Sequence, residues 1–558
     1  MVLLTPDKPI TKDKHGGLMP RISLENLTVW KKLEEQAKAM TSPENHLAHL
    51  VEQKDRLKHF SLKTLSLFFD FSRQRVNREV MSLLFELAVE KQLQEQFNAM
   101  VSGEKVNTTE NRAALHTATR QFSKDPVCVD GKDILPDMAE QRDKIKLFSE
   151  KVRSGQVTGS TGKPFRHVVV VGIGGSYLGT EFVSTALNGF SDGLIKIHYL
   201  SNVDIQNFSQ IIREINLEAT LWVIVSKSYT TTETLANTNL VNAHMIQNHL
   251  DPKRHVVAVT AKGSPGDDPD AEILESFHMF DFIGGRYSVT SAVGGLPLSL
   301  VLGYEIYERF LKGAEQMDIH AARAKVFENA PMIAALLSIW NNNFLAYPAQ
   351  AIIPYASPLA KLAPHIQQLN MESNGKSVTA DGDFLNQTTG TIIFGEPGTN
   401  AQHSFFQLAH QGRPFPIDFI GVIRTQYEDF KSTCKGVNNH QELWANLLSQ
   451  PKALALGKTD DQPAKHFPGN RPSSTLVLND LSPESVGKLL AFYEAKTVFE
   501  AFIWGINPFD QFGVELGKTM ASSIRNEMAE KNNHPEYDFK NADSISGAYL
   551  NMLYQGKV

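Results

Sequence analysis

The stretch of sequence that decides the fold class is HVVVVGIGGS, residues 167–176. A run of β-branched residues that stops at a glycine is typical of a buried strand followed by a tight turn. Glycines let the backbone approach a ligand closely, and free amides at the start of a following helix favour an anion. The stretch therefore predicts a strand-to-helix turn, either as a structural turn alone or as part of a phosphate site.

Similar apolar runs follow at intervals that leave room for helices. The first series begins with residues 167–171 and continues with the runs at residues 195–200, 221–225 and 255–259. A second series lies at residues 351–354, 391–394, 417–423 and 474–478. Strand–helix alternation with nearly continuous apolar strands predicts a parallel sheet covered on both faces. Two such series predict an α/β protein built from two similar domains, one after the other.

The segments outside these series have other patterns. Between residues 23 and 118, apolar residues recur at spacings of three and four, as in Leu62, Leu65 and Phe68, so we expect helices and no strand there. Residues 458–473 are typical of a long surface loop, and residues 542–553 of a final helix. The predicted division is a helical N-terminal arm (1–118), a first α/β domain (119–310), a second α/β domain (311–510) and a C-terminal helical tail (511–558).

Size and composition restrict the class of protein. The chain has 558 residues, which is more than one hydrophobic core usually supports. Its net charge of -6, from 61 acidic and 55 basic residues, argues against a basic nucleic-acid-binding surface. The amino terminus lacks the pattern of a signal peptide, and no apolar run approaches the roughly 18 residues of a membrane span. We therefore expect a cytoplasmic protein with neither a nucleic acid nor a membrane as partner.

A second strand-to-helix segment is SKSYTTTET, residues 226–234. Thr230 and Glu233 have the spacing of a capping box, so we expect a helix to start there. Several hydroxyls and Lys227 at a helix amino terminus suit a phosphate monoester dianion, although a well-capped helix with solvated threonines is the alternative. Neither the glycine turn (residues 172–176) nor this hydroxyl segment (residues 226–234) contains a nucleotide-binding motif. The pattern GxxxxGK[ST] is missing, and Tyr177 stands where GxGxxG requires its third glycine.

Four further side chains could perform acid–base chemistry or stabilise charge. Glu372 lies near the end of a predicted helix. His403 follows the predicted strand at residues 391–394, which places it at the carboxyl edge of the second sheet. Arg286 follows paired glycines and can reach across a cleft to a developing oxyanion. Lys518 follows the helix predicted to end near residue 504. Each of them alone also fits an ordinary role, as a solvated side chain, a structural histidine or a surface salt bridge.

The segments around these residues resemble, in order along the chain, those of the glucose-6-phosphate isomerase family. They are GIGGS (172–176), SKSYTTTET (226–234), GGRYS (284–288), MESNGK (371–376), GEPGTNAQH (395–403), GNRP (469–472) and FDQFGVELGK (509–518). SGEKVN (102–107) and TENR (109–112) also resemble the family. The resemblance implies two SIS-type (flavodoxin-like) doubly wound parallel-sheet domains with a helical N-terminal arm and a C-terminal helical tail, assembled as a homodimer.

The resemblance also implies a sugar phosphate substrate and a set of binding residues. The residues expected to hold the phosphate are Ser226, Lys227, Thr231 and Thr234. Those expected to lie near the sugar or to hold its hydroxyls are Gly175, Ser176, Gln368 and Gln511. The reaction implied is the reversible conversion of glucose 6-phosphate into fructose 6-phosphate, in glycolysis and gluconeogenesis. It requires no metal and no nicotinamide cofactor.

Four catalytic roles follow from the same resemblance. His403, supplied by the partner subunit, would assist ring opening together with Lys518. Glu372 would carry a proton between C2 and C1, and Arg286 would stabilise the enediolate formed between these steps. The chemistry is consistent with the residue types, because such a proton transfer needs one carboxylate, an electrophilic partner for the oxygen charge and a grip on the remote phosphate.

Some positions depart from the family pattern. Ile205 stands where the family usually has glycine, and Thr290 where many members have tryptophan, but neither position carries a proton.

A noncatalytic phosphosugar sensor with SIS domains would need the phosphate loops and not the four catalytic side chains. A bifunctional glucose and mannose phosphate isomerase is closer in chemistry, but such chains are typically shorter. A nicotinamide-dependent dehydrogenase is contradicted by Tyr177.

Overall fold

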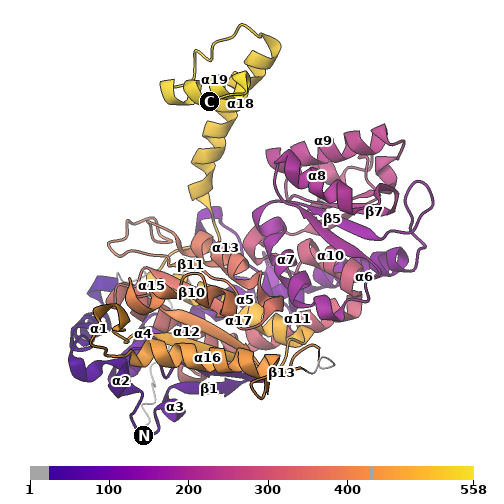
Figure 1. The fold of residues 1–558 in the computed structure, drawn as a ribbon. Helices are drawn as coiled ribbons and strands as arrows, with labels where there is room; N and C mark the ends of the chain where they lie inside the picture. Colours follow the sequence, from indigo (N-terminus) through magenta and orange to yellow (C-terminus); the bar gives the residue numbers. More distant parts are fainter. Residues whose placement is uncertain (1–23, 428–431) are drawn as a thin grey trace. The chain divides into compact units, whose positions relative to one another are not determined.

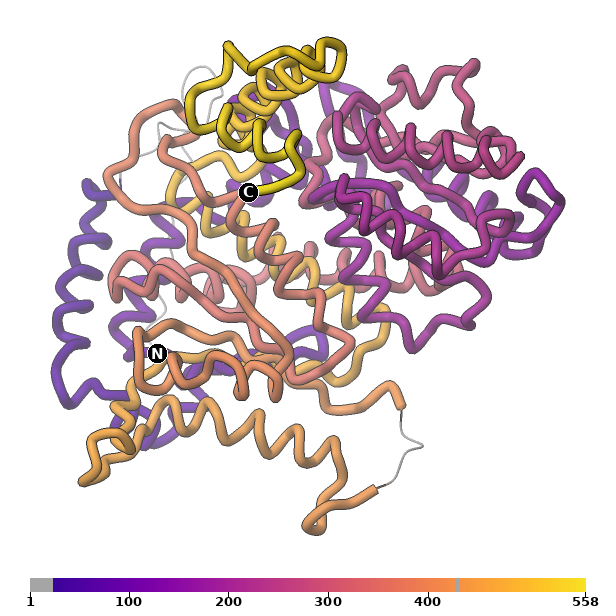
Figure 2. The backbone as a smooth tube through the Cα atoms, turned by 45° about the horizontal axis from the view of Figure 1, so that its top comes forward, coloured from indigo at the N-terminus to yellow at the C-terminus, as the bar shows by residue number. Residues whose placement is uncertain are grey.

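A computed structural model describes residues 24–427 and 432–558. The chain divides into two compact units, one that extends to Pro508 and one that begins at Phe509. Figures 1 and 2 follow the chain from indigo to yellow. Two separate sheets, drawn mainly in purple and in orange, form the framework of the first unit.

The first sheet has five parallel strands in the order β6-β5-β7-β8-β9. The strands are β5 (His167–Val171), β6 (Lys196–Leu200), β7 (Thr220–Val225), β8 (Val256–Ala261) and β9 (Glu275–Met279). Strands β5, β6, β7 and β8 confirm the first predicted series of strands. The sequence ESFHM of β9 alternates polar and apolar residues and was not predicted as a strand, because it lacks the continuous apolar run of its neighbours.

Helices cover both faces of this sheet, as the apolar strands require. On one face, Trp222 and Ile224 of β7 form a core with Phe208 of α8 and Val241 of α9. On the other face, α10 packs on β5 and β9 and against α6 and α7 (Figure 1). The bounds of these helices are α6 (Leu135–Arg153), α7 (Leu178–Ala186), α8 (Ile205–Glu214), α9 (Thr232–Gln247) and α10 (Ala292–Leu302).

The second sheet has six strands in the order β1-β2-β15-β12-β10-β11. Its parallel strands β10 (Ala349–Pro354), β11 (Ile392–Phe394), β12 (Ile417–Val422) and β15 (Ser473–Leu478) confirm the second predicted series. On one face, Phe419 packs with Phe406 of α15 and Leu447 of α16. On the other, Phe69 contacts Phe492 of α17.

The other two strands of this sheet correct the prediction of an N-terminal part without strands. β1 (Ser61–Thr64) and β2 (Leu67–Asp70) form a hairpin, and β2 pairs antiparallel with β15. Leu65 and Ser66 have φ values of 50° and 65°, which makes the tight turn between the strands. The spacing of Leu62, Leu65 and Phe68 predicts a helix, but Leu65 lies in the turn and the neighbouring aromatic residues alternate between the faces of the sheet.

The first unit contains further helices, among which α17 is buried along almost its whole length. Their bounds are α1 (Thr28–Ala39), α2 (Leu47–Leu50), α3 (Arg56–His59), α4 (Arg78–Glu90), α5 (Leu93–Ser102), α11 (Tyr304–Arg323), α12 (Ala330–Ile339), α13 (Leu362–Asn374), α14 (Gly398–Gln402), α15 (Phe406–Gln411), α16 (Asn439–Leu456) and α17 (Pro483–Trp504). Helices α11, α12 and α13 all pack against α17. The fully buried Arg120 donates hydrogen bonds to Asp318 of α11 and Glu494 of α17, and thereby joins the N-terminal part to both helices.

Two two-stranded ribbons and the second unit complete the structure. The ribbons are β3 (Cys128–Val129) with β4 (Lys132–Asp133), and β13 (Thr433–Cys434) with β14 (Val437–Asn438). The second unit consists mainly of α18 (Glu515–Asn533) and α19 (Ser544–Gln555), the latter being the predicted final helix. Phe539 and Leu550 are among its buried apolar side chains. The predicted domain boundaries stay predictions.

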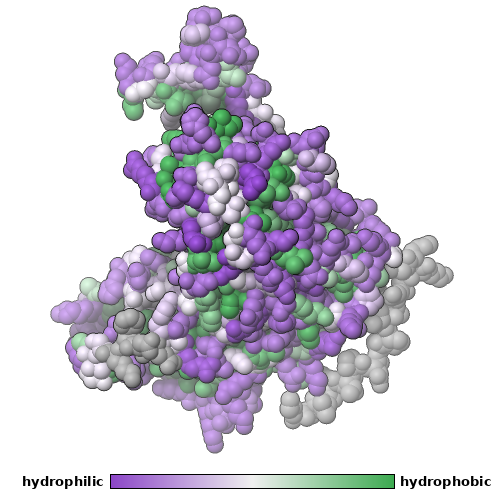
Figure 3. Space-filling view, turned by 90° about the vertical axis from the view of Figure 1, so that its right-hand side faces the viewer, coloured by the Kyte–Doolittle hydropathy of each residue, from purple (hydrophilic) through white to green (hydrophobic). Residues whose placement is uncertain are grey.

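The face of the molecule drawn in Figure 3 is mainly polar. Figure 3 shows a face on which polar side chains predominate and apolar ones form small patches between them. Among the described residues, none of the helices combines the length and apolarity that crossing a membrane demands.

Candidate active site

Three loops meet at one edge of the first sheet, because its parallel strands all end there. They follow β5, β7 and β9, and the last of them carries Arg286. Two of these loops touch through glycines. A Cβ on Gly175 would lie only 2.2 Å from the carbonyl carbon of Gly285, and the hydroxyl of Ser288 donates to the oxygen of Gly175 over 3.3 Å. The glycine turn after β5 therefore lies directly against the segment of Arg286.

Arg286 is held from several directions in the interior, where its side chain is 1% exposed. Its Nε donates to Ser373 Oγ over 2.6 Å, and its Nη2 donates to the carbonyl oxygen of Pro508 over 2.5 Å. The hydroxyl of Tyr287 is hydrogen-bonded to the same Ser373, and burial raises the pKa of Tyr287 to about 12. The guanidinium is thus oriented by fixed groups, in contrast to the surface salt bridge that the sequence also allowed.

Glu372 lies beside this guanidinium, in the last turn of α13 as predicted. Its Oε2 is 3.7 Å from Nη1 of Arg286 and accepts a 2.9 Å hydrogen bond from Nε2 of Gln368, one turn earlier. The Glu372 side chain is 23% exposed, so that the carboxylate is accessible and yet paired. A Cβ on Gly174 would lie 3.0 Å from the Gln368 amide nitrogen, which places the glycine turn next to this pair.

The opposite side of α13 is fixed by a buried carboxylate that the sequence did not reveal. Glu500 of α17 accepts hydrogen bonds from Asn370 (2.6 Å) and Asn374 (2.9 Å), which flank Glu372 by two residues on either side. Lys496 donates to the other Glu500 oxygen over 2.6 Å. Two residues along a helix correspond to about 200°, so Glu372 faces away from this clamp. The signal available in the sequence was the pair Lys496 and Glu500, spaced i, i+4 in a helix segment with many apolar residues.

The hydroxyl segment after β7 forms the amino terminus of α9. The predicted capping box at Thr230 and Glu233 is wrong, because the N-cap residue is Thr231 and Thr230 pairs instead with Ser228. The Thr231 side chain makes no capping hydrogen bond and receives one from Ser226 Oγ over 3.3 Å. Thr234 is buried in the first turn. Hydroxyls at the start of a 16-residue helix remain a suitable arrangement for an anion.

Lys227 extends from this segment to the loop that leads to Arg286. Its Nζ donates to the carbonyl oxygen of Asp281 over 2.9 Å and lies 3.4 Å from Oδ1 of the same residue. Burial lowers the pKa of Lys227 below its ordinary value, and the cation of Arg112 lowers it further. The carboxylates of Asp281 and Glu110 act in the opposite direction. The predicted phosphate lysine therefore lies among two anions and another cation.

Within the first unit, one predicted site residue is not brought to Glu372. His403 follows α14 with an exposed side chain, and within the described residues it has no hydrogen bond to Glu372. Gln511 and Lys518 belong to the second unit, where Lys518 pairs with Glu515 over 2.8 Å. Ser176 lies at the end of the glycine turn. The first unit thus assembles the carboxylate, the guanidinium, one glutamine and the hydroxyl segment.

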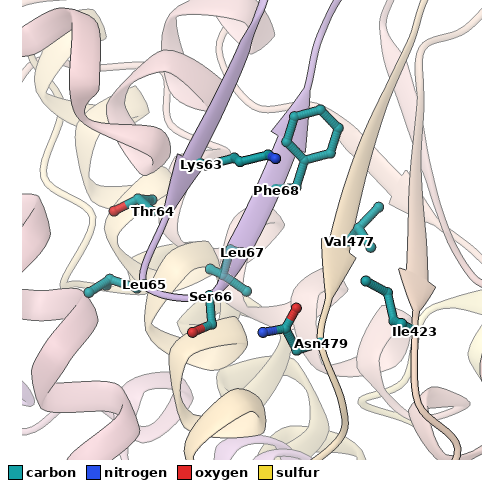
Figure 4. A pocket seen from close by; sticks show the side chains of 9 residues that line it. All are labelled: Lys63, Thr64, Leu65, Ser66, Leu67, Phe68, Ile423, Val477 and Asn479. Carbon is teal, nitrogen blue, oxygen red and sulfur yellow. The ribbon is translucent and has the colours of Figure 1, made fainter.

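A hollow of about 550 Å³ elsewhere in the molecule does not suit acid–base chemistry. It lies between the β1–β2 turn and the carboxyl ends of β12 and β15 (Figure 4). Its lining includes Lys63, Phe68, Val477 and Asn479, with no carboxylate and no imidazole. In the part of the chain that the structure describes, no three His, Cys, Asp or Glu side chains cluster as metal ligands would.

Comparisons with known proteins match this chain over most of its length. The family model for phosphoglucose isomerase matches residues 70–545. Glucose-6-phosphate isomerase of Desulfosudis oleivorans is 64% identical over 534 residues, which cover 95% of this chain and 98% of the relative. The cytosolic enzyme of Spinacia oleracea is 45% identical over 504 residues, covering 87% of this chain and 88% of the relative.

A solved structure supports the same relationship at the level of the fold. The crystal structure of a glucose-6-phosphate isomerase from Chlamydia trachomatis superposes with a TM-score of 0.87 at 37% sequence identity. The match covers 96% of this chain and all of that structure. The chain belongs to the phosphoglucose isomerase family.

Proposed function

We propose that this chain catalyses the reaction of its family, the reversible isomerisation of glucose 6-phosphate and fructose 6-phosphate. The observation that carries the assignment to this site is the placement of Glu372 between Gln368 and Arg286, against the glycine turn. A partly exposed carboxylate beside a fixed guanidinium combines a proton carrier with an anion stabiliser. The reaction is an internal redox exchange between adjacent carbons, so that no external oxidant or reductant is consumed.

The proposed chemical step moves one proton between two carbons. Glu372 removes the proton from C2 of the open-chain aldose, and the electron pair forms a cis-enediolate whose negative charge lies near Arg286. Glu372 then returns the proton to C1, while the hydroxyl proton on O2 is transferred to O1. Since Arg286 is already oriented by Ser373 and Pro508, little reorganisation is needed when the charge develops.

The phosphate end of the substrate is proposed to bind at the amino terminus of α9. The groups assigned to it are Ser226, Lys227, Thr231 and Thr234, with Gly175 and Ser176 close to the sugar and Gln368 and Gln511 holding hydroxyls. The helix dipole and the hydroxyl donors support this assignment. Binding energy gained at the phosphate can then orient C1 and C2 beside Glu372.

Ring opening is assigned to His403 of a second subunit and to Lys518. What supports a shared site is that the exposed His403 has no hydrogen bond to Glu372 within the described residues. In the second unit, α18 and α19 carry exposed apolar side chains such as Leu516 and Tyr549. Such apolar surface is expected to be covered in an assembly. We therefore propose a homodimer.

The shared site has a direct test in mixed dimers. Glu372→Gln and His403→Gln subunits are each expected to be inactive alone. Unfolded and refolded together at equal amounts, they should recover about a quarter of the wild-type activity, because half of the dimers then contain one intact site. No recovery in verified mixed dimers would place both groups of a site on one chain.

The activity itself is tested with the purified protein in the absence of added metal or nucleotide. Fructose 6-phosphate should be converted into glucose 6-phosphate, and the product should be detected by a coupled assay after quenching. A wild-type protein that binds the sugar phosphate without turning it over would contradict the enzyme assignment and favour the sensor. We further propose that the protein acts in the cytoplasm, in glycolysis and gluconeogenesis, since relatives from Spinacia oleracea and Zea mays are described as cytosolic.

A further inference from the structure

The ammonium group of Lys227 is already bound within the protein, in a way that a substrate phosphate must change. The lysine contacts both the carbonyl oxygen (2.9 Å) and the carboxylate (3.4 Å) of Asp281. The backbone on either side of this contact is fixed. The carbonyl of Lys227 accepts from the amide of Ala261 on β8, and the amide of Leu115 donates to the carbonyl of Phe282. The side-chain contact therefore spans two anchored segments.

The two partners differ in how firmly each is placed. The Asp281 side chain is 80% exposed, whereas that of Lys227 is 33% exposed. A second anion, Glu110, lies within electrostatic range of Lys227 and is itself paired with Arg112 over 2.5 Å. An incoming phosphate dianion therefore meets an ammonium that is partly neutralised, and a carboxylate that repels the phosphate from the same place.

We propose that Asp281 is an internal counter-ion of Lys227, which the substrate phosphate displaces, and that it thereby weakens phosphate binding in the resting protein. This proposal rests on the phosphate role assigned to Lys227 above. Asp281 stands five residues before Arg286, so the contact also ties the phosphate segment to the loop of the guanidinium until the substrate arrives. Asp281 is thus a residue that sets affinity, with no part in the proton transfer.

The test uses the full-length protein, with inorganic phosphate as a competitive inhibitor and fructose 6-phosphate as substrate. In Asp281→Asn, the inhibition constant for phosphate and the KM should both fall about two- to fivefold, the range typical of an exposed charge pair. The change in kcat should stay below about twofold. Added salt should reduce the difference, because exposed charges are screened. An unchanged or higher inhibition constant in Asp281→Asn would overturn the proposal.

Two further variants make the result specific. Glu275→Gln removes one negative charge from another lysine pair, with Lys144 over 2.8 Å, at the amino end of β9, and should leave both constants unchanged. Lys227→Met should weaken phosphate binding and abolish the effect of Asp281→Asn. If Lys227→Met leaves phosphate binding intact, the assigned phosphate role is wrong. If it weakens binding and Asp281→Asn still gives no tightening, only the counter-ion proposal is wrong.

Discussion

The two ends of the candidate active site differ in how their side chains are held. At the reacting end, Arg286 is buried and bonded to Ser373 and Pro508, and α13 is clamped to Glu500 behind Glu372. At the phosphate end, hydroxyls pair with one another and Lys227 is bound by a mostly exposed aspartate. This contrast indicates that groups facing a developing charge are fixed in advance, whereas groups that bind an already formed dianion can exchange partners.

The largest effect is expected when the proton carrier at the fixed end is removed. Glu372→Gln keeps the size of the side chain but cannot accept the proton, so kcat should fall about 10⁴-fold. The KM and the inhibition by inorganic phosphate should stay close to the wild type, since the phosphate end is unchanged. Steady-state kinetics check both quantities. A loss below tenfold would remove Glu372 from the central step.

The next effect concerns the geometry of the guanidinium. In Arg286→Lys the charge is kept, but the planar group that reaches Ser373 and Pro508 together is lost. We expect kcat to fall about 10²- to 10³-fold, the range for loss of one oriented donor to an oxyanion. The dissociation constant of the sugar phosphate, measured by calorimetry, should change much less. Equal losses in binding and turnover would indicate that Arg286 holds the substrate rather than the enediolate.

A third prediction uses the buried histidine on α13 to test how rigid this end is. His365 stacks on Phe182, and burial lowers its pKa to about 4. The unfolded chain therefore binds the proton at a higher pH than the folded one, and the stability present above pH 6.5 is lost as the pH falls through 4. From 1.36 kcal/mol per pKa unit, this histidine accounts for about 3 kcal/mol of that loss.

His365→Leu removes this titration and should make stability less dependent on pH in the same range. The measurement is the urea midpoint of wild type and variant at pH 7.5, 6.0, 5.0 and 4.0. The two curves should converge or cross as the pH falls. Parallel curves over the whole range would mean that the buried imidazole is protonated without loss of the native packing.

The smallest effect is expected at the phosphate end. Thr231→Val removes one hydroxyl donor at the amino terminus of α9, and the KM for fructose 6-phosphate should rise about tenfold, as for a hydrogen bond to a charged group. The value of kcat should stay within about twofold. Thr230→Val is a matched control, because Thr230 pairs with Ser228 and is not assigned to the phosphate. A fall in kcat without a change in KM would contradict the division between the two ends.

Much of this architecture follows from local sequence. The continuous apolar runs predicted eight of the parallel strands, and their order along the chain placed the glycine turn and the hydroxyl segment after strands. Glu372 at a helix end was also predicted and confirmed. These features depend on neighbouring residues, which is why a pattern within ten or twenty residues was sufficient to find them.

The features that the sequence did not reveal depend on distant partners. The β1–β2 hairpin is a strand pair because β15, some 400 residues later, offers an edge to which β2 can bond. Glu500 clamps α13 from a helix about 130 residues away. The N-cap of α9 is an exception, because its difference from the prediction is local: Thr231 is the N-cap residue and Thr230 donates a hydrogen bond to the nearby Ser228. For the hairpin and for the Glu500 clamp, a tertiary contact decided what the local pattern left open.

Proton transfer by Glu372 can be tested by NMR in deuterium oxide, which follows the hydrogen at C1 and C2 of the sugar phosphates. Wild-type protein should incorporate deuterium at C1 of fructose 6-phosphate and C2 of glucose 6-phosphate while it isomerises them, because the proton held by Glu372 exchanges with solvent. Glu372→Gln should neither isomerise nor exchange, although it still binds phosphate. Isomerisation over many turnovers with no incorporation, or exchange that persists at the wild-type rate in Glu372→Gln, would contradict proton transfer by this carboxylate.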